Sequence, residues 1–277
     1  MTVDAPDHPA PRDGIGVFDS GVSGLSVLRA LRARVPAVPL IYVADSGHAP
    51  YGERDDAFVI DRALRLTEHL LDRGARLIVV ACNTATAVAI EALRTRWPAT
   101  CFVGVEPGLK PALAASRNGR IGVMATRATL ASARFRRLAD QHARGVDLRL
   151  QACVGLASAL ERGDPDGDEV RSLVSHHVAP LRAAGVDVVV LGCTHYPFAA
   201  SWIQQALGPE VVLIDTADAV ARRAIDLMGK LDAGEERDAV AELWTTGELD
   251  ALRRASTRWL DFPVELRSWP PARVADA

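Results

Sequence analysis

Two of the four cysteines in this chain occur in a sequence context that suits acid/base chemistry. Cys82 and Cys193 each follow an apolar run that ends in a small residue, LIVVAC and VVVLGC, and each precedes polar residues. A thiol, whose unperturbed pKa is about 8.5, exchanges protons near neutral pH when its surroundings favour the thiolate. Two such groups could take a proton from one face of a carbon atom and return one to the opposite face. For Cys101 and Cys153 we expect the ordinary role of small buried hydrophobic residues.

The composition is typical of a globular protein from a reducing compartment. The chain has 277 residues, 49% of them hydrophobic, and a net charge of −3, which excludes strong binding to nucleic acid or anionic membranes. Its cysteines form no CxxC pair, so we expect free thiols and not a disulfide framework. No apolar run approaches the ~18 residues of a membrane span. Residues 1–13, rich in proline and aspartate, predict a disordered tail and not a signal peptide. A cytoplasmic protein is therefore expected.

Short apolar runs alternate with helical patterns along most of the chain. The runs cover residues 14–20, 40–46, 76–83, 101–106, 120–126, 147–153, 187–194 and 211–216. Continuous apolar runs of this length predict strands that are buried on both faces, as in parallel sheets. A further strand and helix are expected after residue 240. Alternating strands and helices predict an α/β fold.

Two of the intervening segments have clear helical stripes. Within 54–73 the stripe consists of Ile60, Ala63, Leu64, Thr67, Leu70 and Leu71, and Gly74 follows where a C-terminal cap belongs. The other stripe consists of Leu25, Leu28, Leu31 and Val35. Residues 107–119, with two prolines near their start, are a plausible crossover between domains, and the acidic stretch 231–240 suits a linker or an exposed helix.

Polar side chains gather where the predicted strands end, which is where open α/β folds carry their functional residues. They are Asp19, Ser20, Asp45, Ser46, Cys82, Asn83, Thr84, Glu106, Thr126, Cys153, Cys193, Thr194, His195, Asp215 and Thr216. The helix after Cys82 should begin near Asn83 or Thr84, so its positive end would favour the thiolate and its amides could hold a carboxylate. The glycine loop 19–24, DSGVSG, lacks the GxGxxG spacing; it could cradle an anion or be an ordinary strand–helix turn.

The sequence contains no clear motif for binding a cofactor or a metal ion. A pyridoxal phosphate enzyme needs a Schiff-base lysine in an apolar setting, but Lys110 and Lys230 are the only lysines and neither ends an apolar strand. A Cys-x-His pair at 193–195 would need two more ligands to hold zinc. His176 and His177 are more typical of a helix surface than of a ligand pair. Proton transfer at carbon would then rest on side chains alone, with no cofactor and no metal.

These motifs together resemble the glutamate racemase family from about residue 14 to residue 262. The matching stretches are GVFDSGVSGLSVL, APYG, GARLIVVACNTAT, GVEPGLKPA, MATRATL and VVVLGCTHYP. The pairing of CNTAT with GCTHYP is specific to this family. The resemblance implies two similar α/β domains with mostly parallel sheets, related by a pseudo-dyad, with the active site in the cleft between them. The first would comprise 14–106 plus about 212–277, and the second about 107–211.

The resemblance also implies a function and a set of site residues. The activity would be cofactor-independent interconversion of L- and D-glutamate, which supplies D-glutamate for peptidoglycan. Cys82 would take the α-proton from the D isomer and Cys193 from the L isomer, each assisted by a neighbour, Asp19 or His195. The substrate-binding residues would be Asp19, Ser20, Tyr51, Gly52, Asn83, Thr84, Thr194 and His195. Thr129 and Glu161 match auxiliary positions for carboxylate contact and acid assistance.

Some departures and alternatives accompany this hypothesis. Ser23 stands where the family usually has a second glycine, which would cost roughly 1 kcal/mol if the backbone there were left-handed. Ala49 and Thr86 replace a larger aliphatic residue and a frequent serine. Asp19 could simply cap the following helix. The alternatives are a related enzyme for aspartate or hydantoin substrates, a non-catalytic protein-binding regulator, and a two-lobed solute-binding protein. A homodimer is left open, because the sequence does not specify the oligomeric state.

Overall fold

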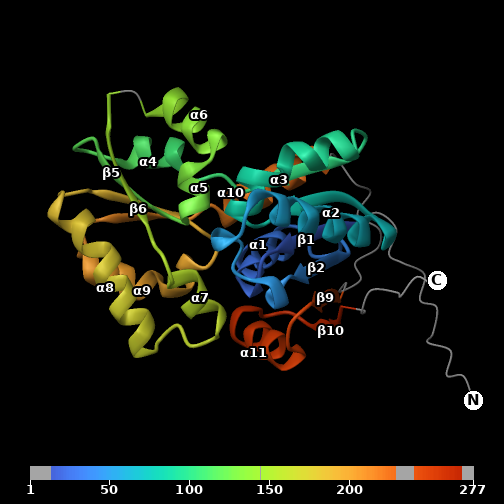
Figure 1. Ribbon diagram of the computed structural model, residues 1–277. Coiled ribbons are helices and arrows are strands. Elements are labelled where there is room, and N and C mark those ends of the chain that lie inside the picture. Colours follow the sequence, from blue (N-terminus) through green and yellow to red (C-terminus); the bar gives the residue numbers. More distant parts are fainter. Residues whose placement is uncertain (1–13, 144, 229–239, 270–277) are drawn as a thin grey trace, which may run out of the picture.

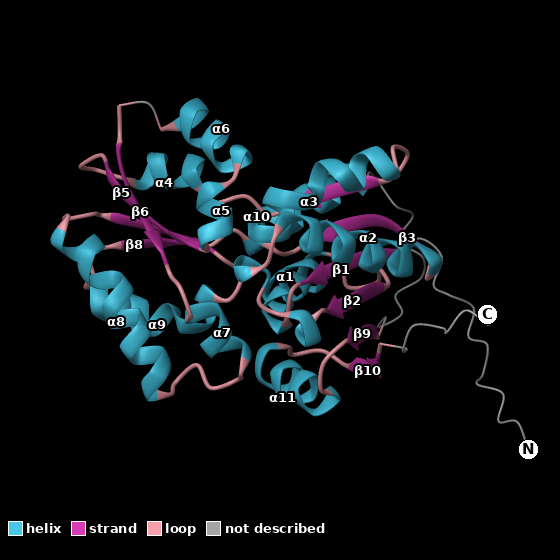
Figure 2. Cartoon of the chain, viewed as in Figure 1, coloured by secondary structure: helices cyan, strands magenta, loops and turns pink. Residues whose placement is uncertain are grey.

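The computed structural model describes residues 14–143, 145–228 and 240–269. The predicted disordered tail at 1–13, and all but the last residue of the predicted linker at 231–240, lie outside this part of the chain. The described residues form two lobes (Figure 1), each built around its own sheet (Figure 2). Every strand pair in both sheets is parallel, which confirms the α/β prediction. None of the described helices is both long and apolar enough to cross a bilayer.

The first lobe has a six-stranded sheet of order β10-β9-β2-β1-β3-β4. Its strands are β1 (Gly14–Asp19), β2 (Leu40–Ala44), β3 (Ala75–Val80), β4 (Cys101–Gly104), β9 (Ala241–Thr245) and β10 (Val264–Ser268). One face is covered by α1 (Leu25–Arg34), α10 (Ala217–Met228) and α11 (Leu249–Trp259), the other by α2 (Asp56–Asp72) and α3 (Asn83–Arg96). Three short 3-10 turns are η1 (Val22–Gly24), η2 (Ser46–His48) and η3 (Tyr51–Glu53).

The second lobe has a four-stranded sheet of order β6-β5-β7-β8. Its strands are β5 (Arg120–Ala125), β6 (Asp147–Ala152), β7 (Val188–Gly192) and β8 (Val212–Ile214). One face is covered by α4 (Leu109–Ala115), α5 (Arg127–Ala131) and α6 (Ala133–His142). The other face is covered by α7 (Leu156–Glu161), α8 (Asp168–Ala183), the 3-10 turn η4 (Tyr196–Ala199) and α9 (Ala200–Leu207).

Burial on both faces explains why the strand sequences are continuously apolar. Along β1, Ile15 and Val17 pack into the cluster under α1, while Phe18 packs into the cluster under α2. Successive side chains of a strand point to opposite faces, so a strand covered on both sides needs apolar residues at nearly every position. All six residues of β1 are buried.

The chain crosses between the lobes twice within the described residues. The first crossing follows β4 and leads into α4, which packs on the second sheet, so the proline-containing segment after residue 106 is a crossover. β8 pairs with β7, and the following helix α10 packs against α1. We therefore place the return crossing at 215–216, slightly beyond the boundary near residue 212 that the sequence suggested.

The structure corrects two details of the predicted elements. In α2 the buried face includes Val59, Arg62 and Leu66, whereas Ile60 and Leu64 lie at its partly buried edge. Arg62 turns inward because it pairs with the buried carboxylate of Asp45, which follows β2, a contact that hydrophobic periodicity cannot reveal. The strand β10 was missed because it alternates charged and apolar residues at the edge of the sheet, with none of its residues fully buried. The predicted cap is confirmed at Gly74, which follows α2 with a left-handed φ of 86°.

An aromatic cluster in the first lobe encloses a histidine. His69, in the last turn of α2, lies between two indole rings, with ring centroids 4.8 Å from Trp244 and 4.3 Å from Trp269. Burial, together with the nearby charge of Arg73, lowers the pKa of His69 to about 4. Among the described atoms its Nε2 has no hydrogen-bond partner. The folded protein therefore keeps this ring neutral through mildly acidic pH.

Replacing His69 with Phe should reduce the loss of stability in mild acid. The unfolded chain protonates His69 near its ordinary pKa of 6.5, but the folded protein does so only at about 4. Between these values the unfolded state binds more protons, so the stability present above pH 6.5 is lost as the pH falls. Urea unfolding at about pH 7 and about pH 5 should show a smaller decrease for His69→Phe than for the wild type. Equal decreases in the two proteins would contradict the assignment.

Candidate active site

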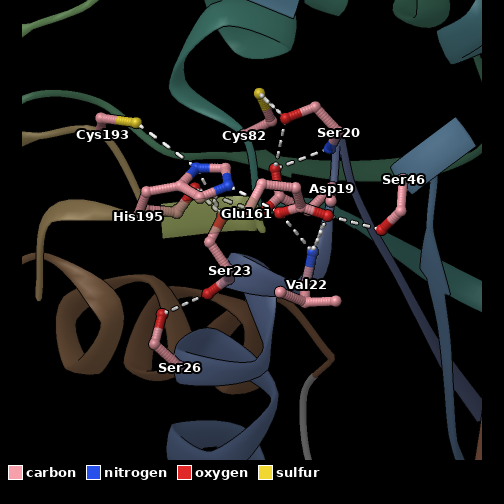
Figure 3. Close-up of polar contacts among 12 residues, drawn as sticks. Asp19, Ser20, Val22, Ser23, Ser26, Ser46, Cys82, Glu161, Cys193 and His195 are labelled. Atoms are coloured by element: carbon pink, nitrogen blue, oxygen red, sulfur yellow. Dashed lines mark hydrogen bonds and ion pairs between the residues drawn. The ribbon is translucent and has the colours of Figure 1, made fainter. Parts of the chain in front are cut away.

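The carboxyl ends of both sheets face the boundary between the lobes and bring the predicted polar residues together. β1 leads into Asp19 and Ser20, β3 leads into Cys82, and β7 leads into Cys193 and His195. Figure 3 shows these side chains in one network, with both sulfur atoms on the same side of it. The four catalytic candidates named from the sequence are all buried there.

Cys82 caps the helix that follows it. It is the N-cap residue of α3, and its Sγ accepts a hydrogen bond from the backbone N–H of Ala85 at 3.5 Å and contacts Ser20 Oγ at 3.6 Å. The sequence predicted that the helix end would favour the thiolate. The helix end does act in that direction, but its effect is outweighed: burial, together with the charge of Asp19, raises the pKa of Cys82 well above its usual value. The contacts with Ala85 and Ser20 lower the pKa but do not offset the burial. Cys82 is therefore held as a neutral thiol.

Cys193 is paired with His195. The Sγ of Cys193 lies 3.7 Å from Nδ1 of His195, and Nε2 of the same ring lies 2.8 Å from Oε2 of Glu161. Burial lowers the pKa of His195, but its contacts with Cys193 and Glu161 raise it by more, so the pKa lies well above its usual value. This places an imidazolium beside the second thiol. The two cysteines thus have different electrostatic surroundings.

Asp19 lies between the two thiols, and within the described residues no hydrogen bond joins its carboxylate to either sulfur. Its Oδ1 accepts from the backbone N–H of Ser20 at 2.7 Å and from the Ser20 hydroxyl at 3.3 Å. Its Oδ2 accepts from Ser23 Oγ at 2.5 Å and from Thr194 Oγ1 at 3.2 Å. Burial raises the pKa of Asp19, while the charge of His195 and the Ser23 hydrogen bond oppose that rise. Neither η1 nor α1 has a side-chain cap, so Asp19 does not serve as a helix cap.

Glu161 joins the lobes at this site. It extends from α7 of the second lobe, and its carboxylate accepts hydrogen bonds from the Val22 backbone N–H at 3.0 Å and from Ser46 Oγ at 2.6 Å, both in the first lobe. A Cβ at Gly21 would lie 2.1 Å from the same carboxylate, so only glycine allows this approach. The sequence had placed Glu161 at an auxiliary acidic position, and the structure brings it to His195.

A cluster of threonines crosses the lobe boundary next to Cys82. Thr84 Oγ1 of the first lobe lies 2.9 Å from Thr126 Oγ1 of the second, and Thr129 Oγ1 lies 3.0 Å from Thr126. Asn83 is buried beside them, and within the described residues its Nδ2 has no hydrogen-bond partner. A buried amide N–H without a partner is costly unless a ligand binds it. Asn83 and the threonines are therefore placed to receive a polar group.

Tyr51 and Gly52 take different positions from those of the other predicted binding residues. The Tyr51 hydroxyl donates to Asp45, which also accepts from Arg62 Nε at 2.9 Å and from Thr246 Oγ1 at 2.8 Å. Its hydroxyl is thus bonded to this buried carboxylate. Gly52 lines a pocket of about 330 Å³ at the lobe boundary.

The same pocket marks the entrance to the site. Thr126 and Cys153 line it together with Gly52, but neither Cys82 nor Cys193 does. These two cysteines are only 5% and 6% exposed. Both thiols are therefore almost completely covered in the described structure.

Sequence reasoning missed part of this network. It gave Ser23, Ser46 and Arg62 no role in the site, although Ser46 was noted at a strand end. An arginine on an otherwise apolar helix face is the signal that could have revealed the contact between Arg62 and Asp45. Outside the site, Cys153 is buried as expected, but Cys101 is exposed because it begins β4 at the edge of the sheet.

The histidine pair predicted to lie on a helix surface is divided between two environments. His176 is exposed, whereas His177 is buried and lies 3.0 Å from the Val154 carbonyl oxygen and 3.2 Å from Gln151. Within the described residues, no three histidine, cysteine, aspartate or glutamate side chains are grouped so that they could hold a metal ion.

Known proteins resemble this chain over most of its length. The Asp/Glu/hydantoin racemase family model matches residues 15–224. A glutamate racemase from Pseudomonas paraeruginosa is 45% identical over 243 residues, covering 87% of this chain and 91% of that protein. One from Herpetosiphon aurantiacus is 50% identical over 218 residues, covering 79% and 85%. The Escherichia coli glutamate racemase, solved with L-glutamate and the activator UDP-MurNAc-Ala, superposes with a TM-score of 0.82 at 30% identity, covering 93% of this chain and 98% of that one.

Alkylation should distinguish the exposed cysteine from the buried thiols. Because only the thiolate reacts, burial and a raised pKa should make Cys82 react with iodoacetamide at least about 10-fold more slowly than Cys101 near neutral pH. Peptide mass spectrometry over time measures each site in the same sample. The variant Cys101→Ser should lose the fast phase and keep the slow one. Equally rapid labelling of Cys82 would contradict its burial as a neutral thiol.

Proposed function

The chain belongs to the Asp/Glu/hydantoin racemase family and is an amino-acid racemase, an isomerase that acts on glutamate. We propose that Cys82 and Cys193 are its two acid/base groups. One observation carries this proposal. Two buried cysteines end strands in different lobes, and one hydrogen-bonded network through Asp19 reaches both. Inversion at a carbon atom requires a base on one face and an acid on the other, and two lobes can supply one group to each face.

The proposed reaction moves two protons. With L-glutamate, the Cα–H bond breaks as the Cys193 thiolate takes the proton and becomes a thiol. The Cys82 thiol then gives its proton to the opposite face of Cα and becomes a thiolate. With D-glutamate the two cysteines exchange roles. No electrons are gained or lost, so the two thiols can carry out both proton transfers without a redox cofactor.

His195 and Asp19 support the two sulfur atoms in this mechanism. The His195 imidazolium, 3.7 Å from Cys193 Sγ, stabilises negative charge on that sulfur. Asp19 acts through the Ser20 hydroxyl on the Cys82 side, because this hydroxyl bonds to the carboxylate and contacts the Cys82 thiol. The neutral Cys82 thiol is in the protonation state that turnover of L-glutamate requires.

We assign substrate binding to polar groups that converge between the lobes. The unpartnered amide of Asn83 and the N-terminus of α3 suit the α-carboxylate, and Thr84 and Thr129 lie beside them. Ser20 and Thr194 border the two thiols. Gly52 lines the pocket at the lobe boundary, and Tyr51, which precedes it, is buried with its hydroxyl bonded to Asp45. Closure of the lobes would exclude water from the carbanion-like transition state.

We also propose that the product is D-glutamate for peptidoglycan, made in the cytoplasm. Four free cysteines, two of them essential to the proposed mechanism, suit a reducing compartment. Peptidoglycan contains D-glutamate, and an isomerase that acts on the abundant L isomer supplies it directly. Glutamate in place of aspartate is favoured by the names of relatives that are 45–50% identical.

The purified protein should racemise glutamate without added pyridoxal phosphate or metal. When the reaction is run in D₂O, deuterium from the solvent should appear chiefly in the product. In D₂O a two-base enzyme delivers solvent deuterium to the face opposite the one from which the proton left, so early D-glutamate formed from L-glutamate should carry deuterium at Cα. Chiral chromatography with mass spectrometry measures both isomers, and aspartate serves as the comparison substrate. Activity lost to a chelator and restored by zinc, or deuterium mainly in recovered substrate, would refute the mechanism.

Single cysteine variants should separate the two half-reactions. Serine is a far weaker acid than cysteine, so Cys82→Ser and Cys193→Ser should each lose racemisation by a factor of about 100 or more. Elimination of chloride from a β-chloro analogue of glutamate needs only one base. Cys82→Ser should therefore still process the L-like analogue, and Cys193→Ser the D-like one, as followed by chloride release. Near wild-type racemisation by either variant would disprove the two-thiol mechanism.

A further inference from the structure

Ser23 occupies the centre of the polar network, although its position usually carries glycine in this family. It lies in η1, directly after the loop that follows β1, and its side chain is fully buried. The 3-10 backbone of η1 is right-handed, so the strain that a left-handed position would impose does not arise. Its Oγ lies 2.5 Å from Asp19 Oδ2, 2.9 Å from Thr194 Oγ1 and 3.0 Å from His195 Nδ1.

The donors and acceptors around Ser23 fix where its hydrogen lies. A serine hydroxyl has one hydrogen to donate, and an ionised carboxylate only accepts, so the hydrogen of Ser23 points to Asp19. The contact with His195 must then use the hydrogen on Nδ1, which Ser23 Oγ accepts. The same Nδ1 hydrogen is the one that faces Cys193 Sγ at 3.7 Å. Ser23 and Cys193 therefore share one hydrogen of the imidazolium.

This sharing matters when Cys193 changes charge. As a thiolate, Cys193 is a strong acceptor for the Nδ1 hydrogen; once it has taken the α-proton, its neutral sulfur accepts only weakly. The buried imidazolium would then lose its partner at Nδ1 just as the substrate proton is transferred. The oxygen of the Ser23 hydroxyl, 3.0 Å from Nδ1, is the replacement acceptor. The hydrogen of the same hydroxyl is donated to Asp19, whose negative charge makes the serine oxygen a better acceptor.

We propose that Ser23 is a positioning residue for the Cys193 half of the reaction, acting as the second acceptor that keeps His195 hydrogen-bonded after Cys193 becomes a thiol. The proposal rests on the two-thiol mechanism above. Ser20 is its counterpart on the other side, because its hydroxyl joins the other oxygen of Asp19 to Cys82. One carboxylate thus serves each thiol through a separate serine.

Racemisation alone cannot test this assignment. L- and D-glutamate have equal free energies, so kcat/KM must be equal in the two directions for every variant. A defect at one thiol would therefore lower both directions together. Elimination from the L-like and D-like β-chloro analogues avoids this constraint, because each reports on one base.

The matched variants Ser23→Ala and Ser20→Ala should have opposite effects on these two eliminations. A hydrogen bond to a charged group contributes about 1.5 kcal/mol or more, so Ser23→Ala should lower kcat for the L-like analogue by about 10-fold or more. Its effect on the D-like analogue should be several-fold smaller. Ser20→Ala should show the reverse preference. The ratio of the two rates in one sample is independent of how much of the protein is folded.

Ser23→Gly distinguishes positioning from packing. Removing Cβ and Oγ together leaves room for about one water molecule, which Asp19, Thr194 and His195 could all bind, whereas the alanine methyl group excludes it. Elimination from the L-like analogue should therefore recover partly in Ser23→Gly relative to Ser23→Ala. A packing role predicts the opposite order, since glycine leaves the larger cavity and the more flexible backbone.

The outcomes separate failure of this inference from failure of the proposed function. Equal losses on both analogues in Ser23→Ala, or no loss, would overturn the role of Ser23 while wild-type racemisation and the single-cysteine variants leave the two-thiol mechanism standing. If the wild type does not racemise glutamate, or Cys193→Ser still does, the proposed function itself fails. A normal preference ratio in Ser20→Ala would overturn only the pairing of the two serines.

Discussion

The carboxylate of Asp19 is a charge removed from water, and the protein must replace the hydrogen bonds that water would have made. Ser20 and Ser23 supply donors from the first lobe, and Thr194 supplies one from the second. Full compensation of this charge is therefore reached only when the lobes are closed. Closure then excludes water from the thiols, and Glu161 adds further bonds across the same boundary. The compact site follows from the need to satisfy one buried charge.

The two cysteines near Asp19 have opposite electrostatic surroundings. Cys82 lies on the side where burial and the carboxylate oppose ionisation, while Cys193 lies beside an imidazolium held by Glu161. In the described structure Cys82 thus has the protonation state of the acid and Cys193 the surroundings that suit a base, and in the proposed mechanism each turnover exchanges the two roles. A nearly symmetric pair of sulfur atoms therefore need not imply a symmetric energy profile.

Much of the fold and the main site residues could be predicted from the sequence, for a physical reason. Parallel strands buried on both faces must be apolar throughout, so their carboxyl ends, and hence Cys82 and Cys193, were visible as breaks in that pattern. Contacts between distant polar residues leave no such periodic trace. Three features depend on how the helices and strands pack together: the ion pair of Arg62 with Asp45, the sharing of the His195 hydrogen by Ser23 and Cys193, and the high pKa of Cys82. The edge strand β10 was not predicted because charged and apolar residues alternate along it and none of its residues is fully buried.

The path of the chain also bears on how it is made. The second lobe is inserted between β4 and α10, and its two ends meet where Gly108 lies against Ile214 and Thr216. Its whole sheet has therefore been synthesised before β9 exists to pair with the free edge of β2. Domains fold as units during translation, so the later lobe is complete first while the earlier one waits for its last two strands. In that interval β2 is an open edge that a nascent chain must protect.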